Sequence, residues 1–337
     1  MSDQTFIIAE LSANHNNDFN IAVNTIKAMA ESGANAVKVQ TYTADSLSID
    51  VDNEYYKAKT EGLWKGYRPY DLYKEASMPY DWQPKLQKVA YDLGLEFFSS
   101  PFDKEGVDFL ETLDIPRYKI ASFEITDIPL IEYAASKGKP MIISTGVAEI
   151  EDIQLAVDVC RKAGNDDITL LKCTSNYPAT IEDANLLTIP DLKKRFGTEV
   201  GVSDHTMGFT VPVVAVSLGG TVVEKHFILD RSMGGPDSAF SMEPDEFKLM
   251  VEEVRKAEKT FGNVNYYVSE KDKLRRRSLF VVKEIRKGEQ ITNENVRSVR
   301  PGHGLSPRYL PKIIGRKAVL DLKKGTPFKL EFIEPVV

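Results

Sequence analysis

The segment Glu199-Val-Gly-Val-Ser-Asp-His-Thr206 is an apolar run that ends in a histidine, and the segment Thr221-Val-Val-Glu-Lys-His226 has the same layout. Apolar, β-branched runs of this length are typical of buried strands, so each histidine is expected at a strand end. The spacing from His205 to His226 is about one strand–helix–strand step. Imidazoles from neighbouring strand ends can form an open metal site. An isolated histidine is more often an ordinary core or surface residue, so the repeated context carries the metal hypothesis.

Outward from these segments, short apolar runs alternate with amphipathic ones from residue 6 to residue 262. The amphipathic runs have the three- and four-residue apolar spacing of core-facing helices. Eight such strand–helix units predict an α/β fold of the (β/α)8 TIM-barrel type. A doubly wound open sheet is the alternative, but no G-x-G-x-x-G pattern follows the first strand. The predicted strands cover 6–11, 36–42, 96–101, 117–122, 141–146, 168–175, 199–206 and 221–229, and the helices include 21–31, 82–93, 105–113, 128–136, 151–163 and 191–196.

Two regions depart from this alternation. Residues 43–82 hold both tryptophans and a patch of tyrosines, which predicts either a lid or sugar-stacking wall, or a segment that packs on the barrel rim. Residues 263–279 read as a linker after the barrel domain, 1–262. Beyond it, Val282-Lys-Glu-Ile-Arg-Lys-Gly288 returns as Val319-Leu-Asp-Leu-Lys-Lys-Gly325, and the turn signals predict a small, mostly β domain over 280–337.

The composition excludes several classes of protein. A formal net charge of −7 gives no reason to expect a nucleic-acid partner. The two cysteines, Cys160 and Cys173, form no disulfide framework and fit a reducing compartment. No apolar stretch approaches the length of a membrane span, and the N-terminal residues lack a signal-peptide layout. We therefore expect a cytoplasmic protein with no membrane partner.

Lysines occur within several of the predicted strands, where an ammonium group is costly unless it is paired. Lys38 and Lys119 on facing strands, with a ring of Ser and Thr hydroxyls, would form a phosphate cradle. The alternative is that each lysine pairs with a structural carboxylate. Lys119 and Ser122 are three residues apart, so within a regular strand their side chains would point to opposite faces. Both can line the same site only if one of them lies past the strand end. Glu10 and Glu124 are candidates for acid–base work, and together these features indicate a metal-assisted carbon–carbon bond enzyme.

Two other classes stay open from the residues alone. A Schiff-base keto-acid aldolase would use Lys119 or Lys172 as its nucleophile. A non-catalytic sugar-binding barrel would not need two strand-end histidines beside a ring of lysine and serine. His15 and His303 have no assigned role at this point.

Eight short motifs are spread along the chain: I-A-E-L-S-A-N-H at 8–15, K-V-Q-T at 38–41, S-S-P-F at 99–102, Y-K-I-A-S-F-E at 118–124, S-T-G at 144–146, K-C-T-S-N-Y-P at 172–178, S-D-H-T at 203–206 and E-K-H-F at 224–227. With these motifs the chain resembles the sialic acid synthase family. Its members condense phosphoenolpyruvate with an N-acylated amino sugar to give a nonulosonic acid. V-R-S-V-R-P-G at 296–302 resembles the family's antifreeze-like (SAF) domain.

Within that family, four segments resemble the pseudaminic acid synthases: G-L-W at 62–64, Y-D-L-Y-K-E-A at 70–76, P-Y-D-W at 79–82 and G-G-P-D-S-A-F-S-M-E-P at 234–244. This resemblance implies 2,4-diacetamido-2,4,6-trideoxy-L-altrose as the acceptor. Synthases of legionaminic acid and N-acetylneuraminic acid are the alternatives.

The resemblance implies roles for individual residues. His205 and His226 match the ligands of a divalent metal, manganese or magnesium, and imidazole suits manganese better. Glu10 is placed to stabilise positive charge on the donor or to deprotonate water. The phosphoenolpyruvate positions match Lys38, Ser100, Lys119, Ser122, Ser144, Ser175 and Ser203, and the acceptor-sugar positions match Gln40, Glu124, Tyr177, Asp237 and Arg300. Ser100 stands where the family usually has Thr, and Ser175 stands where it usually has Asn.

Arg300 matches an arginine that the small domain of one subunit inserts into the active site of its partner. The resemblance therefore implies a domain-swapped homodimer that takes small-molecule substrates.

Overall fold

Eight parallel strands pair in chain order from β1 to β8, and β8 pairs with β1 to close a barrel. The computed structural model describes residues 4–334, so residues 1–3 and 335–337, at the outer ends of the two expected domains, lie outside the described residues. The strands are β1 (Phe6–Glu10), β2 (Ala36–Thr41), β3 (Glu96–Pro101), β4 (Tyr118–Ile120), β5 (Met141–Ser144), β6 (Ile168–Cys173), β7 (Glu199–Asp204) and β8 (Val222–His226). The predicted TIM barrel is confirmed, and the alternative of an open sheet is wrong.

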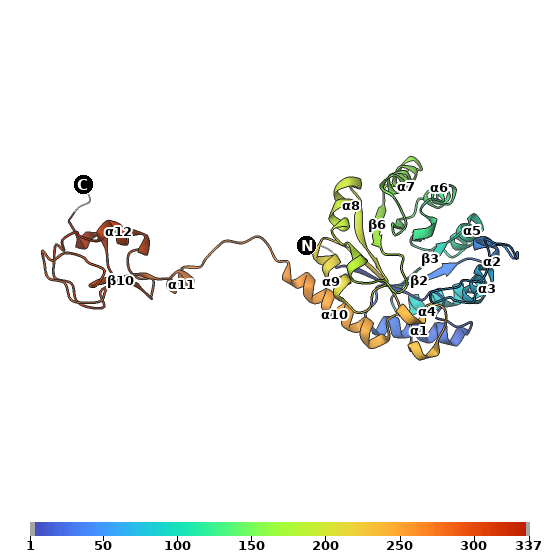
Figure 1. Cartoon of the computed structure of the whole chain (residues 1–337), viewed down its shortest axis with the longest axis horizontal. Helices are drawn as coiled ribbons and strands as arrows, with labels where there is room; N and C mark the ends of the chain where they lie inside the picture. Colours follow the sequence, from blue (N-terminus) through green and yellow to red (C-terminus); the bar gives the residue numbers. More distant parts are fainter. Residues whose placement is uncertain (1–3, 335–337) are drawn as a thin grey trace. The chain divides into compact units, whose positions relative to one another are not determined.

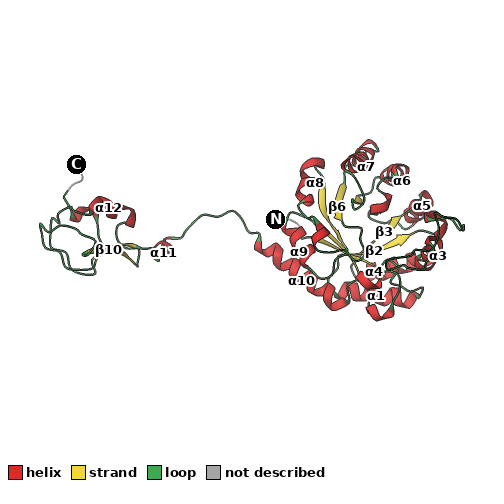
Figure 2. Ribbon diagram, in the orientation of Figure 1, coloured by secondary structure: helices red, strands yellow, loops and turns green. Residues whose placement is uncertain are grey.

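Helices follow the strands and cover the outer face of the barrel (Figures 1 and 2). Local signals set their ends. Asp18 starts α1 by accepting from the backbone N–H groups of Asn20 and Ile21, and Gly197, at φ +65°, ends α8. In the described part of the chain, no helix is both long and apolar enough to cross a membrane. The helices of this unit are α1 (Phe19–Glu31), α2 (Ala44–Leu47), α3 (Pro69–Ala76), α4 (Gln83–Asp92), α5 (Lys104–Thr112), α6 (Ile128–Ala135), α7 (Ile150–Lys162), α8 (Thr188–Phe196), α9 (Thr210–Ser217) and α10 (Pro244–Thr260).

The strand register gathers one set of polar side chains inside the barrel. Glu10 pairs in register with Lys38 on β2 and with His226 on β8, and Ser203 on β7 pairs with Glu224 on β8. Successive residues of a strand point to opposite faces, so these five side chains lie on the same face of the wall. They sit at the carboxyl ends of their strands, where barrel enzymes build their active sites.

Several strands end earlier than the sequence predicts. β4 stops at Ile120, whereas the prediction continued to Ser122, and Ser122–Glu124 forms a 3-10 turn instead. Lys119 therefore lies in the strand and Ser122 lies past its end, as the phase argument required. An apolar run marks where a strand is buried but does not show where the backbone leaves the ladder to turn over the barrel mouth.

The aromatic insertion over residues 43–82 has one tryptophan near the barrel mouth and one on the barrel rim, the two locations that the sequence left open. The Trp64 indole N–H donates to a backbone carbonyl of the loop after β8 at 2.9 Å, and its ring lies 5.7 Å from the ring of Tyr177. Trp82 instead packs edge-on against His15 at 5.7 Å. One tryptophan therefore faces the loops at the barrel mouth, and the other packs on the rim.

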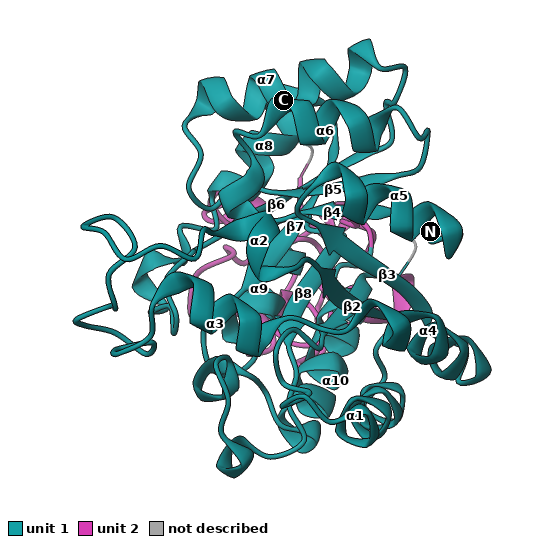
Figure 3. Ribbon diagram, turned by 90° about the vertical axis from the view of Figure 1, so that its right-hand side faces the viewer, with its two compact units in different colours: residues 1–262 teal, residues 263–337 magenta. Residues whose placement is uncertain are grey.

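Residues 263–337 form a second unit with its own core (Figure 3). Within residues 263–334 its regular strands are β9 (Ser278–Val281) and β10 (Val296–Val299), which pair antiparallel. Two short helices accompany them, α11 (Glu270–Lys273) and α12 (Leu310–Ile313). Isolated bridges link the remaining extended segments, so much of the predicted β character consists of single bridges.

The internal repeat of the second unit pairs with itself. Ile285 and Leu322, the equivalent fourth residues of the two copies, exchange backbone hydrogen bonds of 2.9 and 2.7 Å. Each copy ends in a glycine with positive φ, +86° at Gly288 and +88° at Gly325, a conformation that favours glycine. The two copies therefore form equivalent halves of one small core.

Candidate active site

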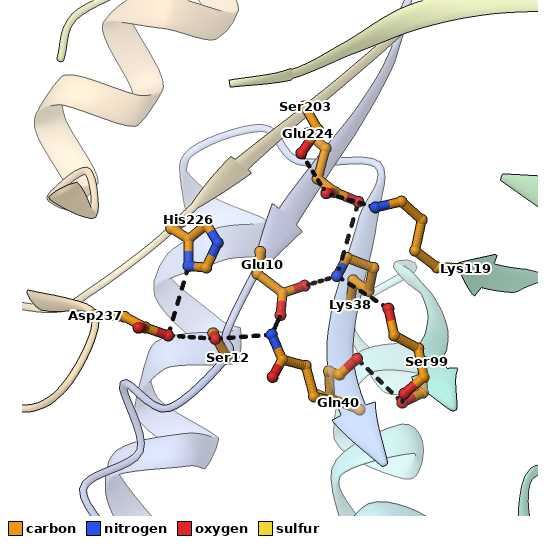
Figure 4. Close-up of polar contacts among 12 residues, drawn as sticks. Glu10, Ser12, Lys38, Gln40, Ser99, Lys119, Ser203, Glu224, His226 and Asp237 are labelled. Atoms are coloured by element: carbon orange, nitrogen blue, oxygen red, sulfur yellow. Dashed lines mark hydrogen bonds and ion pairs between the residues drawn. The ribbon is translucent and has the colours of Figure 1, made fainter. Parts of the chain in front are cut away.

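Four buried charged side chains form a network across the interior of the barrel (Figure 4). Lys38 Nζ lies 2.5 Å from Glu10 Oε2 and 3.8 Å from Glu224 Oε2. Lys119 Nζ donates to Glu224 Oε1 at 3.0 Å. None of the four side chains belongs to a residue more than 4% exposed. Two ammonium groups and two carboxylates balance one another, which allows these charges to remain in an interior.

The two lysines converge, although not as the sequence suggested. β2 and β4 do not face each other, because only β3 lies between them. Lys119 instead reaches across the barrel to Glu224 on β8. Each lysine pairs with a carboxylate, and hydroxyls lie beside the pairs: Lys38 Nζ is 3.4 Å from Ser100 Oγ, and Ser203 Oγ donates to Glu224 at 2.9 Å.

The surroundings give the two carboxyl groups different charge states. Burial raises the pKa of Glu10 above its ordinary value of 4.5, with Lys38 opposing and Glu224 adding to the effect. Burial would also raise the pKa of Glu224, but Lys119 and Lys38 outweigh it and lower that pKa to about 2. Glu224 is therefore a fixed carboxylate, whereas Glu10 is the carboxyl that can hold a proton.

Small polar side chains surround the backbone of Gly146 at the same mouth. A Cβ atom on Gly146 would lie 2.2 Å from Ser175 Oγ, 2.8 Å from Ser122 Oγ and 3.2 Å from Cys173 Sγ. The Gly146 N–H donates to Ser122 Oγ at 3.1 Å. Ser144 Oγ is buried and has no hydrogen-bond partner within residues 4–334. A buried hydroxyl without a partner, next to a glycine that has no side chain to fill the space, is typical of a place where a polar ligand binds.

His205 and His226 lie side by side, with ring centroids 5.2 Å apart. His205 Nδ1 lies 3.0 Å from the carbonyl oxygen of Thr174, and as the donor in that contact it leaves Nε2 with a free lone pair. His226 Nδ1 is buried with no hydrogen-bond partner among the described residues, and Asp237 Oδ2 lies 3.9 Å from it. Burial lowers the pKa of His226 well below 6.5, so its imidazole is neutral at physiological pH.

Two neighbouring imidazoles are a donor set that suits a divalent ion such as manganese. The orphaned Nδ1 of His226 supports this fit, because a buried ring nitrogen without a partner is costly. Across residues 4–334, no group of three or more His, Cys, Asp and Glu side chains is already drawn together as a metal site.

A buried ion pair on the other side of the barrel wall links the two histidines. Lys225 precedes His226 on β8 and points away from it. Its Nζ donates to Asp204 Oδ2 at 2.7 Å and to the carbonyl oxygen of Thr206. Lys225 therefore contacts both residues that flank His205. We call this contact the Lys225–Asp204 clamp, and it fixes the strand ends that carry the two imidazoles.

Gln40 of β2 and two loop residues, Ser12 and Asp237, complete the mouth on the other side of the histidine pair. Gln40 Nε2 donates to Glu10 Oε1 at 3.2 Å and to Ser12 Oγ at 3.0 Å, and the Ser12 hydroxyl donates to Asp237. A continuous polar chain therefore runs from Asp237 to the charge network of the barrel (Figure 4).

Tyr177 and Glu124 lie on loops that follow β6 and β4. The Tyr177 ring is 4.5 Å from the His205 ring, so it lies beside the histidine pair. Glu124 Oε2 is buried without a hydrogen-bond partner in the described part of the chain, and burial raises the pKa of this carboxyl to about 7. A carboxyl in this state can give or take a proton near neutral pH.

Most sequence-predicted site residues come together at this mouth, and a few contributors were not foreseen. Ser12 and Cys173 had no predicted role, although both stand inside the motifs quoted above, and Glu224 was not recognised as the partner of both lysines. Lys172, the other candidate for a Schiff base, points to the opposite face of β6 from Cys173. Its Nζ donates to the Cys173 carbonyl oxygen at 2.8 Å. Arg300 belongs to the second unit, where it is exposed immediately after β10.

A closed (β/α)8 barrel with lysines, hydroxyls and paired imidazoles at its mouth defines an enzyme suited to an anionic substrate. The chain belongs to the NeuB family, whose model matches residues 25–266, and a SAF domain model matches residues 276–334. The resemblance seen in the motifs is therefore confirmed, as is the SAF domain at the C-terminal side.

Relatives cover nearly the whole chain. The pseudaminic acid synthase of Campylobacter jejuni is 46% identical over 329 residues, which span 97% of this chain and 96% of that protein. The N,N'-diacetyllegionaminic acid synthase of Legionella pneumophila is 39% identical over 98% of this chain and 94% of that protein. Among solved structures, the N-acetylneuraminic acid synthetase of Leptospira borgpetersenii matches with a TM-score of 0.71 and 32% identity, over 80% of this chain and 89% of that one.

The raised pKa of Glu124 predicts a pH-dependent effect of Glu124→Gln. The folded-state pKa of about 7 lies above the ordinary 4.5, so ionisation of this carboxyl destabilises the fold as pH rises through that window, and Gln avoids this cost. We expect the unfolding free energy of the wild type, relative to the variant, to fall by roughly 2 kcal/mol from pH 5 to pH 8. Urea denaturation at both pH values measures this change.

The matched control is Glu151→Gln, at an exposed position on α7, for which the difference from the wild type should stay constant. A constant difference for Glu124→Gln as well would contradict the assignment.

Proposed function

We propose that this enzyme condenses phosphoenolpyruvate with 2,4-diacetamido-2,4,6-trideoxy-L-altrose and water, which gives pseudaminic acid and phosphate. The observation that carries this choice is the 46% identity over 97% of the chain to a protein named pseudaminic acid synthase. A legionaminic acid synthase is the alternative, and it would use the same chemistry on a different acceptor. An N-acetylneuraminic acid synthase is a more distant alternative.

In this proposal, phosphoenolpyruvate binds at the lysines and hydroxyls of the barrel mouth. The residues are Lys38, Ser100, Lys119, Ser122, Ser144, Ser175 and Ser203. Lys38 and Lys119 supply positive charge, and the hydroxyls around Gly146 donate to phosphate or carboxylate oxygens. Because both lysines already contact carboxylates, the substrate must compete with Glu10 and Glu224 for them.

His205 and His226 would hold a divalent metal ion, with manganese the better match for imidazole ligands. When bound, such an ion would supply Lewis-acid polarisation of the acceptor's aldehyde oxygen. The chain's own contribution is to keep His226 neutral by burial, to orient His205 through the Thr174 carbonyl, and to hold both through the Lys225–Asp204 clamp.

The acceptor sugar would contact Gln40, Glu124, Tyr177 and Asp237 in its open-chain form. C3 of phosphoenolpyruvate attacks the aldehyde carbon, which forms the new carbon–carbon bond while the aldehyde oxygen gains a proton. Positive charge develops at C2, where Glu10 stabilises it or deprotonates the attacking water. Water adds at C2, and cleavage of the C2–oxygen bond releases phosphate and leaves a keto group. Glu124 gives or takes a proton at the acceptor end.

The proposal extends to a domain-swapped homodimer. Arg300 matches the family arginine that reaches the acceptor in the active site of the partner. A guanidinium is suited to this task because its fixed, charged donors bind polar substituents in a defined geometry.

The substrate assignment predicts phosphate release from phosphoenolpyruvate with manganese and the altrose derivative, and loss of that release with a chelator. The assay compares three acceptors: 2,4-diacetamido-2,4,6-trideoxy-L-altrose, its D-manno counterpart from the legionaminic pathway, and N-acetylmannosamine. Turnover with another sugar would keep the chemistry and change the substrate. No metal-dependent release with any of them would refute the proposed function, and trapping with borohydride and pyruvate would then test a Schiff base on Lys119.

Removal of either imidazole should abolish metal binding while the fold is retained. We expect His205→Ala and His226→Ala to lose manganese binding in isothermal titration calorimetry together with manganese-dependent turnover, because two ligands are the core of the site. Circular dichroism would establish that the barrel persists. His303→Ala, at an exposed histidine of the second unit, is the control and should bind manganese as the wild type does.

The dimer predicts that two defective variants complement each other. Arg300→Ala should weaken use of the acceptor more than use of phosphoenolpyruvate. After co-refolding with His226→Ala, heterodimers hold one complete site, so roughly a quarter of wild-type activity should return. Wild-type behaviour of Arg300→Ala, or no recovery on mixing, would contradict the cross-subunit arrangement.

A further inference from the structure

One residue of the active site has a backbone conformation that its type rarely adopts. Ser12 has φ +46°, in the left-handed region where the Cβ of an L-residue approaches a carbonyl oxygen. In residues 4–334, the other non-glycine residues with positive φ are Asn16, Asn17, Asp114 and Asn185, which are of the types that tolerate it. A glycine at position 12 would adopt this conformation with less strain. A strained residue at a site points to a role for its side chain.

The strain at Ser12 is imposed by the loop around it. Asn14 Nδ2 donates to the Phe227 carbonyl oxygen at 2.9 Å and to Ser241 Oγ at 2.8 Å. Asn16 Nδ2 donates to two backbone carbonyls of the loop after β8, each at 3.3 Å. These contacts fasten the loop after β1 without the Ser12 hydroxyl. The hydroxyl is therefore not needed to shape the backbone.

The Ser12 hydroxyl joins two side chains from different parts of the mouth. Its O–H donates to Asp237 Oδ2, and its oxygen accepts from Gln40 Nε2 at 3.0 Å. Gln40 Nε2 also donates to Glu10 Oε1 at 3.2 Å. Ser12 is only 4% exposed, so these two contacts, rather than bulk water, satisfy its hydroxyl. Figure 4 shows Ser12 midway between Asp237 and Gln40.

These hydrogen bonds determine which atoms face a ligand. Gln40 directs its amide nitrogen to Ser12 and Glu10, which leaves Oε1 as the atom that can accept from a hydroxyl or an acetamido N–H. Asp237 directs Oδ2 to Ser12, which leaves Oδ1 for the same purpose. Without the Ser12 hydroxyl, Asp237 Oδ2 would keep only the N–H of Ala13, at 3.4 Å, and Gln40 Nε2 would keep only Glu10.

We propose that Ser12 is a positioning residue for the acceptor sugar, whose hydroxyl holds Gln40 and Asp237 in the orientation that receives the sugar's polar substituents. This inference rests on the proposed function, in which these two side chains bind the acceptor. Ser12 has no hydrogen bond to the lysines or to the hydroxyls around Gly146. Its effect should therefore fall on one substrate and not on the other.

Two variants separate the hydroxyl from the backbone strain. Ser12→Gly removes the hydroxyl and relieves the left-handed φ, whereas Ser12→Ala removes the hydroxyl and keeps the Cβ. Both should raise KM for the acceptor by roughly tenfold, since each loses a hydrogen bond to a charged group. KM for phosphoenolpyruvate should stay within about twofold of the wild type. The thermal midpoint of Ser12→Gly should lie above that of Ser12→Ala.

The matched control is Asp114→Gly, which relieves a similar φ of +47° at a side chain that is 96% exposed, on the loop between α5 and β4 at the opposite end of the barrel. Both KM values should be unchanged there.

Unchanged acceptor KM in both Ser12 variants would overturn the inference. Equal rises in the two KM values, with both thermal midpoints lowered, would also overturn it, because that pattern reports only damage to the fold. If the wild type uses a different sugar, only the substrate assignment fails, and the comparison is made with that sugar. If the wild type turns over none of the three sugars, the proposed function and this inference both fail.

Discussion

The structure depends on the mutual neutralisation of Glu10, Lys38, Lys119 and Glu224 inside the barrel. These side chains come from β1, β2, β4 and β8, so one electrostatic requirement ties together half of the strands. Loss of one partner would leave an uncompensated buried charge, at a cost of about 3–5 kcal/mol. In the proposed function, the same two ammonium groups bind the anionic substrate in a dry interior, where it competes with Glu10 and Glu224 for them. Stability and the proposed ligand binding would then make use of the same charges.

The sequence predicted the parts of this molecule that depend on local pattern. Apolar, β-branched runs located all eight strands, and the repeated strand-end context located His205 and His226. Contacts across the barrel were not predictable in this way, because the partnership of Lys119 with Glu224 joins residues 105 positions apart. The strained conformation of Ser12 left no mark in the composition. The position of Trp64 beside Tyr177 depends on how a long insertion folds back over the mouth.

The mouth divides into a part built on strands and a part built on loops. Lysines, the fixed carboxylate Glu224 and the histidine pair stand on or directly after strands whose register the whole barrel enforces. Gln40 stands on a strand as well, but its neighbours Ser12, Asp237 and Tyr177 stand on loops that only a few side-chain contacts hold. Chemistry common to a family is expected on the first part, and choice of acceptor on the second. This division matches the resemblance in the sequence, where the strand-end motifs indicated the family and loop segments indicated the pseudaminic acid synthases.

The Lys225–Asp204 clamp has a consequence for anyone who alters this protein. It lies in the layer between barrel and helices, where engineers usually replace polar groups with larger apolar ones to raise thermal tolerance. A more apolar pair there could improve heat resistance and yet let the two strand ends that carry the imidazoles shift. Selection for stability alone would not detect such a loss. Libraries built for robustness should therefore keep Lys225 and Asp204 constant.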